Sequence, residues 1–171
     1  MPSVFSTASP SAPAFPPFTH LAKSTPSQRR KPRIVMTLGD PAGIGPEVVL
    51  KTLSSKSFEQ MAEITVIGNR TLLQNAYTQL QATNPDIDLA DPDTLNFIDI
   101  NAPKAVTSSV IVGQGNSSSG EIAFQTLQSA IARTIEGQFD GIVTAPIAKS
   151  AWLAAGHHYP GQTELLAEMS Q

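Results

Sequence analysis

Short apolar runs rich in β-branched residues alternate with segments of helical periodicity, and this predicts an α/β domain with a largely parallel sheet. Two further observations support that fold class. The first two helices follow their strands through turns that contain glycine, and no internal repeat of 20–50 residues is visible. At 171 residues the chain is long enough for one domain with its own core.

The first strand is predicted at residues 33–38, an apolar run that ends in a glycine-rich turn. Pro46 stands where a first helical turn tolerates a missing N–H, and Glu47 is favourable near a helix N-terminus, so a helix is expected to about Leu53. A second strand is expected at 64–67, with Gly68 ending it, followed by a helix at 71–80.

The middle of the chain is less regular. Residues 81–94 are rich in Asp, Pro and Asn and predict a loop, and residues 95–100 predict a third strand. Residues 101–116 are ambiguous, and residues 108–112 fit either a short edge strand or an extended loop. A long amphipathic helix then follows, with Ser118 or Ser119 as its cap and Gly137 at its end.

The last third predicts another buried strand at 141–144, a helix at 147–155 that Gly156 ends, and a final helix at 163–170. Three apolar residues of that final helix need a partner surface: Leu165, Leu166 and Met169. Because the chain stops just after them, we infer that it is a fragment of a longer protein. The alternative is a short domain whose terminal helix docks on the sheet.

Residues 1–32 differ from the rest, because seven prolines are interleaved with serines and no acidic residue occurs. This composition predicts a disordered tail ahead of a domain at residues 33–171. The alternative is an organelle transit peptide, since the segment is Ser-rich, acid-free and basic at its end. No amphipathic basic helix is visible there, so the tail is the preferred interpretation and a cytoplasmic location is expected.

Composition excludes several classes of function. A net charge of -3 gives no electrostatic footprint for nucleic acid or an anionic membrane, and no apolar run approaches the ~20 residues that span a bilayer. The absence of cysteine excludes disulfides, thiolate nucleophiles and zinc–thiolate sites. His157 and His158 are adjacent and point in different directions on regular structure, so they do not predict a metal site.

The turn at residues 39–47 joins the first strand to the first helix. Ligands of such sheets bind at the carboxyl ends of strands, and Gly43 and Gly45 would let backbone N–H groups approach a ligand beside Asp40. No Gly-Lys-Ser/Thr follows, and Val48 stands at the third position of a G-x-G-x-x-G pattern. A tight structural turn is therefore an equal alternative.

Two later segments also carry candidate chemistry. Lys149 follows the strand at 141–144 and could pair with a phosphate or carboxylate, or be an exposed helix lysine. Thr163 can cap the final helix, and it or Gln162 could hydrogen-bond a substrate. A plain structural cap is the alternative for Thr163.

Taken together, three segments resemble the 4-hydroxythreonine-4-phosphate dehydrogenase family. They are Thr-Leu-Gly-Asp-Pro-Ala-Gly-Ile-Gly-Pro-Glu at 37–47, Gly-Ile-Val-Thr-Ala-Pro-Ile-Ala-Lys at 141–149 and Pro-Gly-Gln-Thr-Glu at 160–164. The order and the spacing of these three segments also match those of the family. The resemblance covers residues 33–171 and about the first half of a typical member. It implies an incomplete α/β/α sandwich like that of isocitrate and isopropylmalate dehydrogenases.

The resemblance also implies an activity. Family members oxidise the secondary alcohol of 4-phosphooxy-threonine with NAD or NADP, and the product loses carbon dioxide to give 3-amino-2-oxopropyl phosphate in vitamin B6 synthesis. A divalent metal (zinc, magnesium or cobalt) polarises the hydroxyl, and the enzyme is a homodimer. The three metal-binding histidines belong to later segments, so ligands are expected beyond residue 171, no metal site is expected in this chain, and the isolated chain is expected to be inactive.

Only some residues carry over. Gln162 and Thr163 match two adjacent substrate-contacting positions of the family. Many members have His at the first of these positions. Gln does not titrate near neutrality, so the role that remains for Gln162 is to orient the substrate and not to act as a general acid or base. Lys149 matches a central lysine, and Asp40 with the turn glycines matches a stretch that lines the cleft. Catalytic and cofactor-binding residues stay unassigned. Alternatives are a dehydrogenase of another four-carbon phosphorylated hydroxy acid or of an aromatic-acid diol, and a phosphate-binding α/β domain without dehydrogenase activity.

Overall fold

A computed structural model describes residues 30–171, and residues 31–171 form one compact unit. The tail predicted at 1–32, with its transit-peptide alternative, lies almost wholly outside the described residues. Within the described part of the chain, no helix combines the length and the hydropathy needed to cross a membrane.

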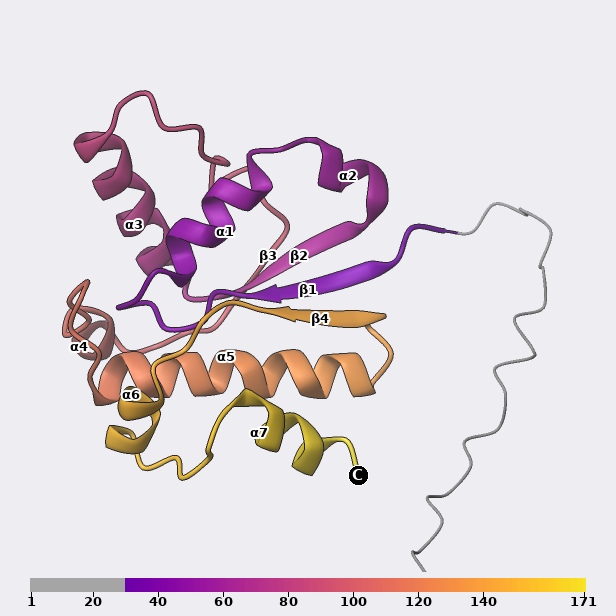
Figure 1. Cartoon of the computed structure of the whole chain (residues 1–171), viewed down its shortest axis with the longest axis vertical. Helices are drawn as coiled ribbons and strands as arrows, with labels where there is room; N and C mark the ends of the chain where they lie inside the picture. Colours follow the sequence, from indigo (N-terminus) through magenta and orange to yellow (C-terminus); the bar gives the residue numbers. More distant parts are fainter. Residues whose placement is uncertain (1–29) are drawn as a thin grey trace, which may run out of the picture. The chain divides into compact units, whose positions relative to one another are not determined.

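The centre of the unit is a four-stranded parallel sheet, which confirms the predicted fold class. Its order is β3-β2-β1-β4, so the first strand lies inside the sheet and the last strand lies at its margin (Figure 1). The strands are β1 (Arg33–Thr37), β2 (Glu63–Gly68), β3 (Phe97–Asp99) and β4 (Gly141–Thr144).

Helices cover the two faces of the sheet in separate layers (Figure 1). α1 (Gly45–Leu53) and α3 (Arg70–Thr83) lie on one face, and α5 (Ser117–Ile135) lies on the other with α6 (Lys149–Ala154) and α7 (Gln162–Met169) beyond it. Two short helices complete the set: α2 (Ser57–Met61) and α4 (Lys104–Thr107). The arrangement is an α/β/α sandwich, as expected.

Each face has its own apolar core. On the α1 face, Met36 and Val66 of the sheet pack with Val49, Leu50 and Leu73 of the helices. On the other face, side chains of α5, α6 and α7 form one cluster: Phe124, Leu127, Ile131, Trp152 and Leu165. Alternate strand residues face opposite sides of a sheet, which explains why neighbouring residues of β1 serve different cores.

The terminal helix has a partner inside the chain. Leu165 is 1% exposed, and Leu166 and Met169 pack against the same cluster on α5 and α6. The helix therefore packs on α5 and α6, and Ile142 of β4 contacts the same cluster. Leu165, Leu166 and Met169 thus have a partner surface within the chain.

Strand β4 differs from its prediction as a buried strand. Its burial falls off toward its end, and Val143 is 46% exposed. Within residues 30–171, β4 pairs with β1 on one side only, and this place at the margin of the sheet explains why it is less covered than β1 and β2. An apolar β-branched run predicts a strand, but it does not state whether both faces of that strand are covered within the same chain.

Several helix boundaries also differ. Asn116, and not Ser118 or Ser119, caps α5: its side chain accepts from the Ser119 N–H, while Ser119 completes the capping box. The N-cap of α7 is Gly161 and not Thr163, and α6 begins at Lys149 and not at residue 147. α3 runs three residues past its predicted end.

The ambiguous segment at 101–116 contains α4, which was not predicted, followed by turns. Ile111 and Gln114 form an isolated bridge, so the extended-loop alternative is correct for residues 108–112. α2 was also not predicted; it has no buried residue, and such a short surface helix leaves no clear periodic pattern.

Candidate functional site

The turns that follow β1 and β4 meet at the carboxyl edge of the sheet. Thr37 and Thr144, the last residues of these strands, are register partners. Beyond them, the Asp40 N–H donates to the Pro146 carbonyl at 2.9 Å, and the Ala145 N–H donates to Thr37 Oγ1 at 3.3 Å. The first two segments singled out in the sequence are therefore in direct contact.

Two glycines permit this contact. Gly39 has φ +66, and a Cβ there would lie 2.2 Å from the Pro146 oxygen. A Cβ at Gly45 would lie 2.0 Å from the Leu38 oxygen. For these two residues glycine is required by packing, which supports the structural-turn interpretation. Gly43, in contrast, is exposed at the tip of the turn.

Asp40 shapes the turn from inside. It is 2% exposed, and its Oδ1 accepts a hydrogen bond from the Ala42 N–H at 2.8 Å. Its Oδ2 lies 3.5 Å from where a Cβ of Gly115 would stand, so the carboxylate points toward the loop ahead of α5. A side chain–backbone bond of this kind stabilises a tight turn.

Gln162 links the third segment to the second. Its Nε2 donates to the Ala145 carbonyl at 3.3 Å. Its Oε1 is buried and has no hydrogen-bond donor among the described residues. A buried acceptor without a donor costs about 1–3 kcal/mol, so a hydrogen-bond donor from outside the described residues would stabilise this position.

Lys149 lies beside the same segment. A Cβ at Gly161 would stand 3.6 Å from Lys149 Cε and 3.8 Å from its Nζ. The lysine is exposed and has no ion pair within the described part of the chain, so its ammonium is available to an anion. Thr163, the second residue of α7, is exposed on the same short stretch.

The structure thus brings Lys149 and Gln162 to the carboxyl edge, with Thr163 next to Gln162. Among the predicted site residues, Asp40 and Gly45 are buried within the turn, and Gly43 lines a small pocket of about 100 Å³ against α3, away from Gln162.

A larger hollow of about 420 Å³ adjoins Lys149. It is lined by Lys149, Ser150, Leu153, His157, His158, Tyr159 and Pro160.

The loop between α6 and α7 is held by aromatic and charged contacts that the sequence pattern did not reveal. The His157 ring stacks on Phe124 with 3.5 Å between centroids, and its Nε2 lies 2.7 Å from Glu121 Oε2. Tyr159 donates to Glu168 at 3.1 Å; partial burial, that hydrogen bond and the carboxylate charge raise its pKa above the ordinary 10.0. The contacts of His157 join residues more than 30 positions apart, and the Tyr159–Glu168 bond spans a loop and a helix, so local periodicity carries no signal for them.

His157 and His158 do not lie in a cluster of possible metal ligands within the described part of the chain. Within residues 30–171, no three His, Cys, Asp or Glu side chains gather closely enough to hold a metal ion. The donor set for a divalent cation is therefore not present in the described residues.

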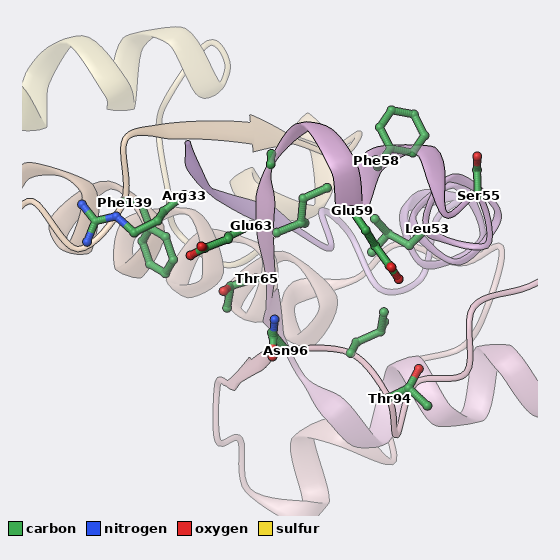
Figure 2. A pocket seen from close by; sticks show the side chains of 13 residues that line it. Arg33, Leu53, Ser55, Phe58, Glu59, Glu63, Thr65, Thr94, Asn96 and Phe139 are labelled. Carbon is green, nitrogen blue, oxygen red and sulfur yellow. The ribbon is translucent and has the colours of Figure 1, made fainter. Parts of the chain in front are cut away.

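Another hollow, of about 400 Å³, lies at the opposite edge of the sheet (Figure 2). Arg33, Glu63 and Asn96 place it at the amino ends of β1, β2 and β3. It contains none of the predicted site residues. Because ligands of parallel α/β sheets bind at the carboxyl edge, the candidate site remains at the turns after β1 and β4.

The described residues form a parallel α/β/α sandwich whose carboxyl edge carries a glycine turn, a lysine without an ion pair among residues 30–171, and a Gln-Thr pair. This edge is where ligands of the parallel α/β class bind. Residues 60–171 match the family described as pyridoxal phosphate biosynthetic protein PdxA, and the chain belongs to this family.

Curated relatives are named 4-hydroxythreonine-4-phosphate dehydrogenase. One from Synechocystis is 54% identical over 136 residues, which is 80% of this chain and 38% of the relative. One from Nostoc is 48% identical over 143 residues, which is 84% of this chain and 40% of the relative. The chain thus spans about two fifths of the length of these relatives.

Solved structures agree with the fold. A 4-hydroxythreonine-4-phosphate dehydrogenase from Burkholderia phymatum superimposes with a TM-score of 0.70 at 32% identity, covering 82% of this chain and 44% of that one. A terephthalate dihydrodiol dehydrogenase from Burkholderia xenovorans has a TM-score of 0.57 at 22% identity, a likeness of fold alone.

Proposed function

We propose that this chain forms part of an enzyme that oxidises 4-phosphooxy-threonine with NAD or NADP. The oxidation product then loses carbon dioxide to give 3-amino-2-oxopropyl phosphate for pyridoxal phosphate synthesis. The observation that carries this proposal is the meeting of Lys149 and Gln162 with the glycine turn at one carboxyl edge. Family membership and the names of the relatives support it.

The roles of the residues follow from their chemistry. The Lys149 ammonium attracts the phosphate or carboxylate of the substrate. Gln162 and Thr163 orient the substrate by hydrogen bonds, since neither side chain titrates near neutrality. The turn that contains Asp40 keeps the backbone of Pro146 in place beneath them. The weaker assignments, Gly43, Gly45 and Asp40, act through the shape of this turn.

The divalent metal and the nicotinamide cofactor of the family need further residues. A bound metal would polarise the substrate hydroxyl, but the described residues supply no donor set for it. We expect its ligands in the polypeptide that corresponds to the rest of the longer relatives. The same reasoning predicts that this chain alone is inactive. A homodimer and a cytoplasmic location are further family-based proposals.

A chimera tests the function. In this chimera, the 136 matched residues of this chain replace the equivalent residues of the Synechocystis relative. The rest of the chimera is the unchanged sequence of that relative. We expect metal-dependent reduction of NAD or NADP with 4-phosphooxy-threonine, and lower kcat/KM with erythronate or threonate phosphates. The parent enzyme, assayed in parallel, calibrates the rate.

Two results would contradict the proposal. One is a folded chimera that reduces neither cofactor while the parent enzyme is active. The other is a chimera that prefers a different four-carbon phosphorylated acid, which would favour the alternative substrate. Activity of the isolated 171-residue chain would contradict the expectation that it is inactive alone.

A further inference from the structure

We propose that Glu121 of α5 positions the substrate-contacting residue Gln162 through His157. The three residues belong to α5, α7 and the loop between α6 and α7. This inference rests on the proposed function and adds to it a positioning residue that lies outside the three sequence motifs.

The first observation is the short bond between Glu121 and His157. Glu121 Oε2 lies 2.7 Å from His157 Nε2, and Glu121 Oε1 accepts from Gln125 Nε2 at 2.6 Å. An ionised carboxylate only accepts hydrogen bonds, so the imidazole Nε2 is the donor. Both carboxylate oxygens are therefore engaged, and Gln125 fixes the direction in which Glu121 faces the imidazole.

The second observation is the orientation of the His157 ring on Phe124. The two ring planes are 5° apart, and their centroids are 3.5 Å apart. Aromatic pairs prefer offset or edge-to-face arrangements over such a face-to-face sandwich. Stacking alone does not select this orientation, so we attribute it to the hydrogen bond with Glu121.

Both partners of this hydrogen bond are attached to packed helices. A Cβ at Gly120 would lie 2.0 Å from the Ala151 carbonyl oxygen, so the backbones of α5 and α6 are in direct contact beside Glu121. The His157 N–H donates to the Trp152 carbonyl at 2.9 Å, and Trp152 is fully buried in α6. The bond therefore fixes the start of the loop relative to a rigid pair of helices.

A short connection leads from this fixed point to Gln162. Tyr159 packs against Phe124 with 5.8 Å between ring centroids, so one side chain supports two residues of the loop. Gln162 follows three residues later and donates to the Ala145 carbonyl at 3.3 Å. That distance is beyond the usual N–H···O range of about 2.7–3.2 Å, so a small displacement of His157 is enough to break the bond.

The same loop forms a wall of the hollow beside Lys149. Four of its residues line that hollow: His157, His158, Tyr159 and Pro160. Leu165 holds α7 on α5, whereas the bond to Glu121 holds the loop that precedes α7. Glu121 therefore controls how the loop faces Lys149 and where the Gln162 amide lies.

The isotopically labelled 171-residue chain provides a test that needs no catalysis. The side-chain amide resonance of Gln162 is assigned by its loss in Gln162→Ala, and its chemical shift reports the bond to Ala145. We expect Glu121→Ala to move this resonance, and Glu121→Gln, whose amide oxygen still accepts, to leave it near the wild-type position. Glu136→Ala, at the opposite end of α5, is the matched control, because it also removes a carboxylate that accepts from a glutamine. It should leave the resonance unmoved.

Kinetics of the chimera give the second test. Glu121→Ala should raise KM for 4-phosphooxy-threonine about two- to fivefold and keep kcat within about twofold, because it acts through one substrate hydrogen bond. In a chimera that already carries Gln162→Ala, Glu121→Ala should leave KM unchanged. A general loss of stability would not disappear in the Gln162→Ala background.

Far-UV circular dichroism establishes that each variant is folded. Two results would overturn the inference: a Gln162 resonance that Glu121→Ala does not move, or an effect of Glu121→Ala on KM that is equally large with and without Gln162. A resonance that responds in the labelled chain, together with a chimera that has no dehydrogenase activity, would count against the proposed function and in favour of this positioning role.

Discussion

The side-chain amide of Gln162 donates a hydrogen bond to the backbone carbonyl of Ala145, 17 residues earlier in the chain. The neighbouring Pro146 carbonyl accepts from Asp40 in the glycine turn. A two-residue stretch after β4 therefore connects the turn after β1 to the start of α7. This connection places residues from three distant segments around one edge of the sheet.

The first prediction concerns Gln162. In the active chimera, Gln162→Ala should raise KM for 4-phosphooxy-threonine about three- to tenfold, the effect of losing one hydrogen bond of roughly 0.5–1.5 kcal/mol. Gln81→Ala, which removes an exposed glutamine on α3, is the matched control and should leave KM unchanged. KM is measured by steady-state kinetics. A KM of Gln162→Ala equal to that of the unsubstituted chimera would show that Gln162 does not contact the substrate.

The glycine turn gives a second prediction. Gly39→Ala should lower the free energy of unfolding by more than about 3 kcal/mol, because it adds a clash with Pro146 to an unfavourable positive φ. Gly137 has φ +76 but open space around its Cβ position, so Gly137→Ala should cost only about 1–2 kcal/mol. Urea denaturation of the two variants separates backbone strain from the clash. Equal losses of unfolding free energy in the two variants would show that a side chain at residue 39 does not clash with Pro146.

A pair of leucines tests the docking of α7. Leu165 is 1% exposed and Leu153 is 59% exposed. Leu165→Ala should destabilise the chain by about 2–5 kcal/mol, whereas Leu153→Ala should change stability by less than about 0.5 kcal/mol. If thermal and urea denaturation showed the same stability for both variants, α7 would not be packed on α5 in solution.

The raised pKa of Tyr159 predicts that the free energy of unfolding depends on pH in the alkaline range. Burial, together with the hydrogen bond and charge of Glu168, raises its pKa above the ordinary 10.0. A raised pKa in the folded state means that this contribution to stability is complete below about pH 10 and is lost as the pH rises through the higher folded value.

Tyr159→Phe should therefore remove part of the alkaline fall in the free energy of unfolding, and Tyr77→Phe, which keeps Tyr159, should retain it. Denaturation curves collected between neutral and strongly alkaline pH give this comparison. An unchanged alkaline slope in Tyr159→Phe would show that the phenol is not coupled to folding.

The order of strands and helices could be predicted from sequence because each relies on local chemistry. The apolar run before Gly39 and the proline at the start of α1 both act within a few residues. The cap of α5 was missed because Asn116, Ser118 and Ser119 are all good capping residues, and only the backbone geometry selects among them.

The candidate site was predictable in part. The motifs that contain Lys149 and Gln162 were visible as sequence, and strand ends indicated their common edge. The burial of Asp40, the exposed margin of β4 and the stacking of His157 on Phe124 depend on residues distant in the chain. No local pattern contains that information.

The most direct test of the common edge is a titration of the isotopically labelled chain with 4-phosphooxy-threonine, followed by backbone amide chemical shifts. We predict that the shifts cluster on residues 39–45, 145–149 and 161–163 together, and that Lys149→Ala weakens all of them. Shifts confined to the amino-edge pocket around Thr65 and Asn96, or shifts in only one of the three segments, would contradict a single substrate-binding edge.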